Sequence, residues 1–146
     1  MSKILNMLMA FVMSFGISGS NVNPSDIPEN SNFEVHFIDV GQADSALIEC
    51  DGETMMIDGG NVADSNVVAA YLKKEDVTEL NYVVCSHAHE DHVGGLSGAL
   101  SVTKADNIYA PKTKANTKAY KNFKKKAEEQ NVEIKHPNVG DEIQLG

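Results

Sequence analysis

The sequence contains no arginine, no tryptophan and only two cysteines in 146 residues. Two cysteines are too few for a scaffold built on disulfides. Cys50 and Cys85 each lie in an apolar run, which predicts two buried thiols and leaves a single disulfide as the alternative. Basic residues are also missing between residues 4 and 72, where acids recur, and this acidic half suits the binding of cations. With 42% apolar residues, the chain can form one globular domain with a substantial core.

The amino end predicts an export segment. Lys3 precedes an apolar stretch over residues 4–17, and small residues follow, as in a signal peptide. The stretch falls short of the roughly 20 residues that a membrane-spanning helix needs. We expect a signal peptide or an uncleaved anchor at residues 1–20, a flexible linker at residues 21–32 and the folded part at residues 33–146. The protein is then exported, extracellular or at the cell surface, and touches the membrane only through this segment.

A dense group of potential metal ligands occupies residues 87–95, whose sequence is HAHEDHVGG. Three of the five histidines of the chain fall there, directly after an apolar run that predicts a buried strand. Residues two apart in an extended segment point the same way, so His87 and His89 can converge on one ion. Asp91 and His92 follow a bend and can reach a second ion about 3.5–4 Å away. The pattern predicts a site for two divalent ions.

Three segments resemble one known family. The HxHxDH pattern resembles the metal signature of the metallo-β-lactamase superfamily. VHFIDVGQADS at residues 35–45 resembles the opening of the extracellular metallo-β-lactamase-like domain of ComEC-type DNA-uptake proteins, and MIDGG at residues 56–60 resembles the next segment of that domain. Ala43 departs from this branch, which usually has Gly there. The resemblance covers residues 33–146.

The order of predicted elements indicates an α/β (α+β) fold. Short apolar runs separated by turn residues predict an antiparallel meander up to residue 57, after which strands alternate with helices. The resemblance implies a metallo-β-lactamase-like αβ/βα sandwich, of which this chain holds roughly the first half. The second half of that fold supplies another His, an Asp and a final His, whereas the only later histidine here, His136, lies at a strand exit. We therefore expect an N-terminal part of the domain, truncated at the carboxyl end.

Three aspartates fall at the ends of predicted strands. Asp39, Asp44 and Asp58 can either bond within their own turns or carry polar groups toward a site. The resemblance implies that Asp58 lies beside the metal loop and orients the ligands, and Asp39 and Asp44 are candidates for the same role. His36 lies in the middle of a strand, where a lone histidine is typical of a structural role.

Seven of the twelve lysines lie between residues 112 and 126, where no acid occurs. An apolar stripe at helical spacing, formed by Tyr120, Phe123 and Ala127, predicts an amphipathic helix over residues 117–130. Its lysines can contact the phosphates of a nucleic acid or simply face solvent, and both interpretations stay open. The candidates for nucleic-acid contact are Lys118, Lys121, Lys124 and Lys125.

The resemblance implies a metal-dependent hydrolase. Two divalent ions, Zn²⁺ or alternatively Mn²⁺, would be held by the four ligands, and a metal-bound hydroxide would attack the substrate with Asp91 as the catalytic residue. For the ComEC-like branch the substrate is DNA or another phosphodiester outside the membrane. An acyl or β-lactam hydrolase and an inactive fragment or binding module are the alternatives. The chemistry is expected of an intact parent protein rather than of a truncated chain.

Overall fold

The structure, a computed structural model, describes residues 31–146. This part of the chain is built on one six-stranded sheet. The strands follow one another across the sheet in the order of the sequence, from β1 to β6. The predicted export segment at residues 1–20 and the predicted linker up to residue 30 lie outside the described residues. Residues Asn32–Gly146 form one compact unit.

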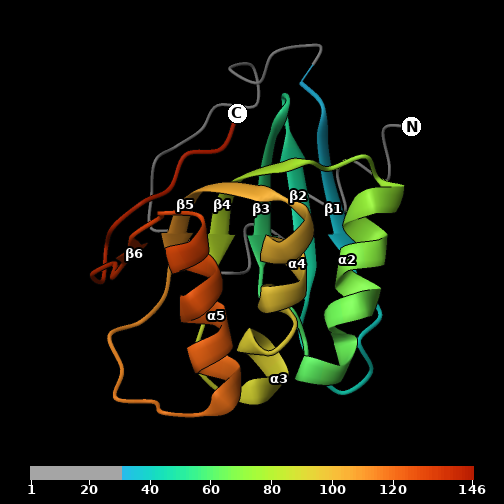
Figure 1. Cartoon of the computed structure of the whole chain (residues 1–146). Helices are drawn as coiled ribbons and strands as arrows, with labels where there is room; N and C mark the ends of the chain where they lie inside the picture. Colours follow the sequence, from blue (N-terminus) through green and yellow to red (C-terminus); the bar gives the residue numbers. More distant parts are fainter. Residues whose placement is uncertain (1–30) are drawn as a thin grey trace. The chain divides into compact units, whose positions relative to one another are not determined.

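The first three strands form the predicted antiparallel meander (Figure 1). Strand β1 (Phe33–Phe37) pairs with β2 (Ala46–Cys50), and β2 pairs with β3 (Glu53–Ile57). The two-residue turn between β2 and β3 holds Asp51 at φ 48° and Gly52 at φ 89°. Asp and Gly tolerate this left-handed conformation, so the turn fixes the register of the hairpin.

Parallel strands alternate with helices in the rest of the sheet. Strand β4 (Glu79–Val84) pairs with β3, β5 (Lys104–Tyr109) pairs with β4, and the short β6 (Ile134–Lys135) pairs with β5. The predicted α/β (α+β) class is confirmed, because a meander is followed by parallel strands with helical connections. The helical elements are η2 (Val62–Asp64), α2 (Ser65–Lys74), α3 (Glu90–Val93), α4 (Leu96–Val102) and α5 (Lys118–Glu129).

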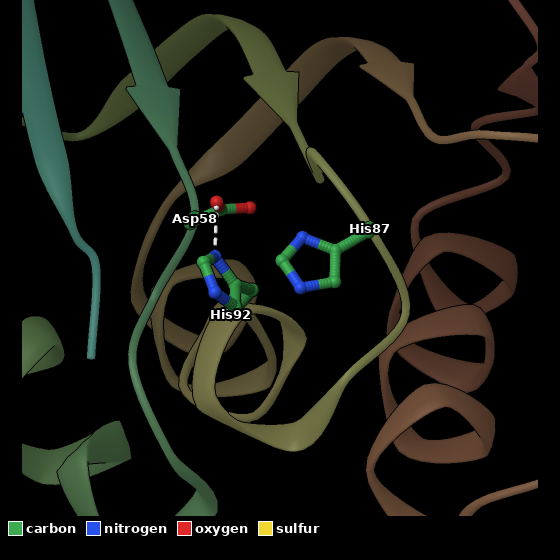
Figure 2. Close-up of side chains that lie close together, drawn as sticks. All are labelled: Asp58, His87 and His92. Carbon is green, nitrogen blue, oxygen red and sulfur yellow. Dashed lines mark hydrogen bonds and ion pairs between the residues drawn. The ribbon is translucent and has the colours of Figure 1, made fainter. Parts of the chain in front are cut away.

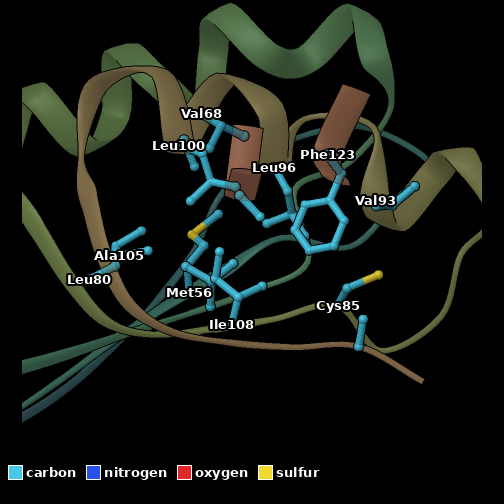
Figure 3. Close-up of a cluster of buried hydrophobic side chains, with 14 of the residues drawn as sticks. Met56, Val68, Leu80, Cys85, Val93, Leu96, Leu100, Ala105, Ile108 and Phe123 are labelled. Atoms are coloured by element: carbon cyan, nitrogen blue, oxygen red, sulfur yellow. The ribbon is translucent and has the colours of Figure 1, made fainter. Parts of the chain in front are cut away.

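The helices lie against one face of the sheet, and the core fills the space between the two layers (Figures 1 and 3). Burial of one large apolar side chain contributes about 1.5–3 kcal/mol. This core fixes the carboxyl ends of the parallel strands, from which the candidate site projects. Its fully buried members include Leu47, Met56, Leu80, Val83 and Ile108 from the strands and Val68, Leu72, Leu96 and Phe123 from the helices.

Helix α5 has the amphipathic pattern that the sequence predicts. Its N-cap residue, Thr117, accepts a hydrogen bond from the backbone N–H of Tyr120 at 3.2 Å. Tyr120, Phe123 and Ala127 are buried against the core, so the lysines of this helix face outward. Across residues 31–146, no helix is both long enough and apolar enough to cross a lipid bilayer.

Candidate metal centre

Two neighbouring parallel strands end side by side and carry the site. Ile57 at the end of β3 pairs with Val84 at the end of β4. The backbone N–H of Asp58 donates to the carbonyl oxygen of Val84 at 2.9 Å, which keeps the two chains together one residue further. The loop over residues 85–89 then leads from β4 into α3. Asp58 and the histidine-bearing loop therefore meet at one edge of the sheet (Figure 2).

Asp58 is a buried carboxylate that holds this loop. Its backbone lies in the left-handed region at φ 55°, and its side chain is only 4% exposed. Oδ1 accepts a hydrogen bond from the backbone N–H of Ser86 at 2.8 Å, and Oδ2 accepts one from the Ser86 hydroxyl. Such donors offset the cost of burying a carboxylate. Ser86 is not among the residues predicted from the sequence, although a hydroxyl directly before His87 is a signal that could have found it.

His92 lies in α3 and points toward Asp58. Its Nδ1 is 2.8 Å from Oδ2 of Asp58. The carboxylate favours the tautomer in which Nδ1–H donates, and this leaves Nε2 as the nitrogen that can bind an ion. Figure 2 shows the His87 ring beside the His92 ring, and the ring centroids are 3.8 Å apart. The bond to Asp58 thus orients Nε2 of His92, a potential ligand nitrogen.

The four predicted ligands form one cluster, called the loop cluster here: His87, His89, Asp91 and His92. Ligand atoms of His87, His89 and Asp91 lie within 4.8 Å of one another, and those of Asp58, His87 and His92 form a second such group. Oδ2 of Asp91 also lies 3.8 Å from Nε2 of His92, so these two side chains approach one another as well. The division into His87 with His89 for one ion and Asp91 with His92 for the other stays a prediction.

Glycines let the α3 segment approach the loop after β3 closely. The backbone N–H of Gly59 donates to the carbonyl oxygen of His92 at 2.7 Å, and that of Gly95 donates to the carbonyl oxygen of Gly60 at 3.1 Å. A Cβ atom at Gly95 would collide with the carbonyl group of Gly59. Backbone contact between the two loops therefore fixes the position of His92 relative to Asp58.

Asp44 and Asp39 lie in the connection between β1 and β2 but make different contacts. Oδ2 of Asp44 is 3.7 Å from Nε2 of His92, and the Asp44 backbone N–H donates to a carbonyl oxygen of α3 at 3.4 Å. Asp39 is exposed, and its Oδ1 accepts from the backbone N–H of Gly41 at 3.1 Å, which closes a local turn. Of the three aspartates expected to orient the ligands, Asp58 and Asp44 reach His92, whereas Asp39 bonds within its own turn.

The cysteines and the remaining histidines lie outside the loop cluster. Both cysteines are free rather than joined in a disulfide, and Cys85 is buried as predicted, whereas Cys50 is only partly buried. Burial raises the pKa of Cys85 to about 12, and the charge of Asp58 adds to this effect, so the thiol stays protonated and is a poor metal ligand. Nδ1 of His136 bonds to the carbonyl oxygen of Ala110 at 2.8 Å. His36 bonds to a tyrosine of α2, in keeping with the structural role expected of it.

The lysines proposed for nucleic-acid contact lie on α5, outside the loop cluster. Helix α5 packs against α3, and its amino end lies next to α3 (Figure 1). Nζ of Lys124 is 5.7 Å from the centroid of the Tyr120 ring, and Nζ of Lys125 is 3.7 Å from the Glu129 carboxylate. We call the exposed set the lysine row: Lys118, Lys121, Lys124 and Lys125.

The donor set of the loop cluster fits a divalent transition-metal ion. Imidazole nitrogens and carboxylate oxygens are ligands that zinc takes at about 2.0–2.2 Å. The ring of His92 is already oriented by a buried carboxylate, a feature that accompanies most histidine ligands of metals in proteins. The arrangement can therefore hold cations at the sheet edge and expose them to a substrate from the side of His89 and Asp91, which are less buried than His92.

Comparison with known proteins identifies one family. A family profile described as the metallo-beta-lactamase superfamily matches residues 38–144. No curated protein matches the sequence. Among solved structures, the metallo-beta-lactamase SMB-1 bound to 2-mercaptoethanesulfonate is similar at 20% identity with a TM-score of 0.56, over 76% of this chain and 46% of that chain. Identity at this level shows a shared fold alone.

Two further solved structures match over smaller parts. A metallo-beta-lactamase of Cronobacter sakazakii, the S60 mutant of a HARLDQ motif, has 20% identity and a TM-score of 0.47, over 53% of this chain and 30% of that chain. The chemotaxis sensor ODP, described as a peroxy diiron species, has 24% identity and a TM-score of 0.46, over 57% of this chain and 36% of that chain. The chain thus spans less than half the length of each of these structures.

Proposed function

Because the chain belongs to the metallo-beta-lactamase superfamily, we propose that it is the metal-binding part of a hydrolase of the ComEC-like branch. The proposed substrates are phosphodiesters, nucleic acid in particular, outside the membrane. The observation that carries this proposal is the loop cluster at the ends of β3 and β4, with His92 held by Asp58. The activity is proposed for a complete domain that contains these residues, since the chain covers 46% of the length of the SMB-1 structure.

The loop cluster supplies the proposed ligands. His87 and His89 would hold one divalent ion, and Asp91 and His92, whose ligand atoms lie 3.8 Å apart, would hold a neighbouring one, with Zn²⁺ or Mn²⁺ as the ions. Bound there, a divalent ion polarises the scissile ester and activates water for attack near neutral pH.

Other side chains near the cluster have roles that their contacts suggest. The Asp91 carboxylate, 40% exposed, can accept a hydrogen bond from an attacking water and orient it, which makes Asp91 the proposed catalytic residue. Asp58 positions the His92 ring, and Ser86 positions Asp58 by donating two hydrogen bonds to it. Oδ2 of Asp44 lies 3.7 Å from the other ring nitrogen of His92, Nε2.

Two features support a phosphodiester rather than an uncharged substrate. The lysine row gives an acidic protein, with a net charge of −9, a group of exposed positive charges on α5, a helix that packs against α3. Such a surface attracts polyanions through counterion release. VHFIDVGQADS at residues 35–45 resembles ComEC-type proteins, and the predicted export segment would place the protein where external DNA occurs.

The test measures hydrolysis of three substrates, two phosphodiesters and a β-lactam, by the complete protein in its Zn²⁺-loaded and Mn²⁺-loaded forms. We expect cleavage of bis(p-nitrophenyl) phosphate and of single-stranded DNA, and loss of both in the double variant with His87→Ala and His89→Ala. The variant His136→Gln is the matched control, because this histidine bonds only to a backbone carbonyl oxygen. Turnover of a β-lactam without phosphodiester cleavage would show an acyl hydrolase instead. Stoichiometric metal without either activity would indicate a binding module, and absence of bound metal would refute the proposal.

A further inference from the structure

A groove crosses the helix layer on the side that faces away from the sheet. Helix α4 contacts both α2 and α5 and forms the floor between these two longer helices (Figure 1). The groove has a volume of about 420 Å³, within the range of roughly 300–1,000 Å³ that is typical of ligand sites. Along α2 it extends from Ser65 to Lys73, about 12 Å of helix. We call it the helix groove.

Small residues form the floor of the helix groove. Ala69 of α2 and three residues of α4, Ser97, Gly98 and Ser101, line it. A Cβ atom at Gly98 would lie 2.2 Å from the carbonyl oxygen of Ser65, so glycine lets the two helices approach this closely. The buried residues of α4 lie on its other side, against the core. The hollow between α2 and α5 is therefore open to solvent and is not filled by side chains of α4.

The walls of the helix groove carry an excess of positive charge. Lys73 lines it from α2, and Lys125, a member of the lysine row, lines it from α5 together with Lys126. Among the described residues that line it, Glu129 is the only acid, and its carboxylate lies 2.8 Å from Nζ of Lys126 and 3.7 Å from Nζ of Lys125. Lys73 has no ion-pair partner within residues 31–146. Three ammonium groups thus face one carboxylate, in a protein whose net charge is −9. A positive hollow of this kind attracts anions.

Two amide side chains add hydrogen-bond donors to the walls. Asn66 lies on α2 and Asn122 on α5, and neither side chain bonds to another residue in the described part of the chain. Each amide offers two N–H donors. The described residues that line the groove include no aromatic ring on which a base could stack. Ammonium and amide donors without an aromatic surface suit phosphate groups rather than nucleobases.

The positive side of α5 continues from the helix groove toward the loop cluster. Lys118, Asn122 and Lys126 are spaced four residues apart and therefore share one side of this helix. The amino end of α5, which carries Lys118, lies next to α3 (Figure 1). Helix α3 in turn carries Asp91 and His92 of the loop cluster. A strand that is bound at the loop cluster can therefore continue along α5 into the helix groove.

We propose that the helix groove binds the phosphate backbone of single-stranded nucleic acid, outside the loop cluster. This inference rests on the proposed phosphodiester function, because the strand in the groove is the part of the substrate that extends beyond the reacting bond. Lys73, Lys125 and Lys126 contact the phosphates, and the amides of Asn66 and Asn122 donate hydrogen bonds to them. Contacts of this kind do not depend on the base sequence. The groove thus adds affinity for a longer strand.

The test measures DNA binding in the absence of catalysis. The full chain with His87→Ala and His89→Ala, kept in a chelator, is titrated against fluorescently labelled single-stranded DNA by anisotropy. We expect the further pair Lys73→Gln with Lys126→Gln to weaken binding roughly three- to tenfold and to flatten the slope of log K against log salt by about 1.4. The pair Lys74→Gln with Lys135→Gln is the matched control, because it removes the same charge from residues that do not line the groove. This control should leave the slope unchanged.

A second variant separates binding from folding. Asn122→Asp places a carboxylate in the groove, four residues from both Lys118 and Lys126, where ion pairs of opposite charge support a helix. We expect the urea midpoint to stay the same or rise, while the affinity for single-stranded DNA falls at least roughly threefold. Asn131→Asp makes the same change after the end of α5, outside the groove, and should leave the affinity unchanged.

Three outcomes would overturn this proposal. In the first, the groove variants bind DNA as well as the parent does. In the second, the groove variants and their controls lose the same affinity, which would show a general effect of net charge. In the third, pyrophosphate displaces the DNA at concentrations too low to act through ionic strength, which would assign the groove to a small phosphorylated ligand. Failure of the proposed function gives a different result, because phosphodiester cleavage is then absent while the groove variants still weaken DNA binding.

Discussion

The loop cluster and the lysine row differ in how firmly the fold holds their side chains. The loop cluster is held by the Asp58 carboxylate, which is 4% exposed, receives two hydrogen bonds from Ser86 and bonds His92 at 2.8 Å. In the lysine row, side chains extend into solvent, and Lys125, 72% exposed, lies 3.7 Å from Glu129. Hydrogen bonds hold the side chains of the first arrangement in one geometry, whereas the exposed lysine side chains can adopt many.

This difference separates two kinds of contribution to function. Groups fixed in a buried network act at one place and are little affected by salt. Exposed charges attract a polyanion over a distance but are screened, and each contributes little. Substitutions in the loop cluster should therefore have large effects that salt does not alter, and substitutions in the lysine row should have small effects that salt does alter.

Removal of two ligands from the loop cluster should have the largest effect. In the double variant with His87→Ala and His89→Ala, the group of His87, His89 and Asp91 keeps a single ligand, too few to hold an ion. We expect loss of at least one bound metal ion per chain, measured by elemental analysis after dialysis, and loss of hydrolysis to the background level. Unchanged metal content would show that these histidines are not ligands.

Loss of the carboxylate that orients His92 should have the next largest effect. Asp58→Asn keeps the size of the side chain and a residue type that tolerates φ 55°, but it removes the charge. Residues that hydrogen-bond a metal ligand contribute about 10–100-fold to metal affinity or activity. We expect the affinity for Zn²⁺, measured by competition titration, to fall by a factor in that range.

Asp39→Asn is the matched control for this change. Asp39 lies in the connection between β1 and β2 and bonds only to the turn at Gly41, so its substitution should leave Zn²⁺ affinity unchanged. Equal losses in the two variants would indicate a general effect of charge rather than orientation of His92.

Loss of the Ser86 hydroxyl, which donates a hydrogen bond to Asp58, should have a smaller effect. Ser86→Ala removes one of the two bonds from Ser86 to the buried carboxylate. Hydrogen bonds to charged groups contribute roughly 1.5–3 kcal/mol to stability. We expect the free energy of unfolding in urea to fall by an amount in the lower part of this range, and Zn²⁺ to bind a few-fold more weakly. Ser101→Ala, which removes an exposed bond within α4, should cost less than about 0.5 kcal/mol. Equal losses would contradict the role of Ser86.

The sequence predicts the ligands of the loop cluster better than their arrangement. The HxHxDH spacing and the strand before it identify His87, His89, Asp91 and His92, and the structure brings all four together. The backbone contact that places His92, from the N–H of Gly59 to its carbonyl oxygen, could not be predicted, because it depends on how α3 packs against the loop after β3.

The same limit applies to the contacts between distant segments. The meander and the amphipathic helix follow from local patterns, which is why they are confirmed. The bond of Ser86 to Asp58 and the approach of Glu34 and Glu49 to His36 depend on register and on side-chain direction. Composition and spacing carry no information on either.

Substitutions in the lysine row should have the smallest effect and the clearest dependence on salt. Lys118→Gln with Lys121→Gln removes two exposed charges on α5 without touching the buried stripe. We expect affinity for single-stranded DNA to fall roughly two- to tenfold, with metal content unchanged. Loss of two phosphate contacts should flatten the slope of log K against log salt by about 1.4, measured by fluorescence anisotropy. The control is Lys104→Gln with Lys135→Gln, two exposed lysines of β5 and β6 rather than of α5. If both double variants change the slope equally, the attraction reflects net charge and the row has no specific role in binding DNA.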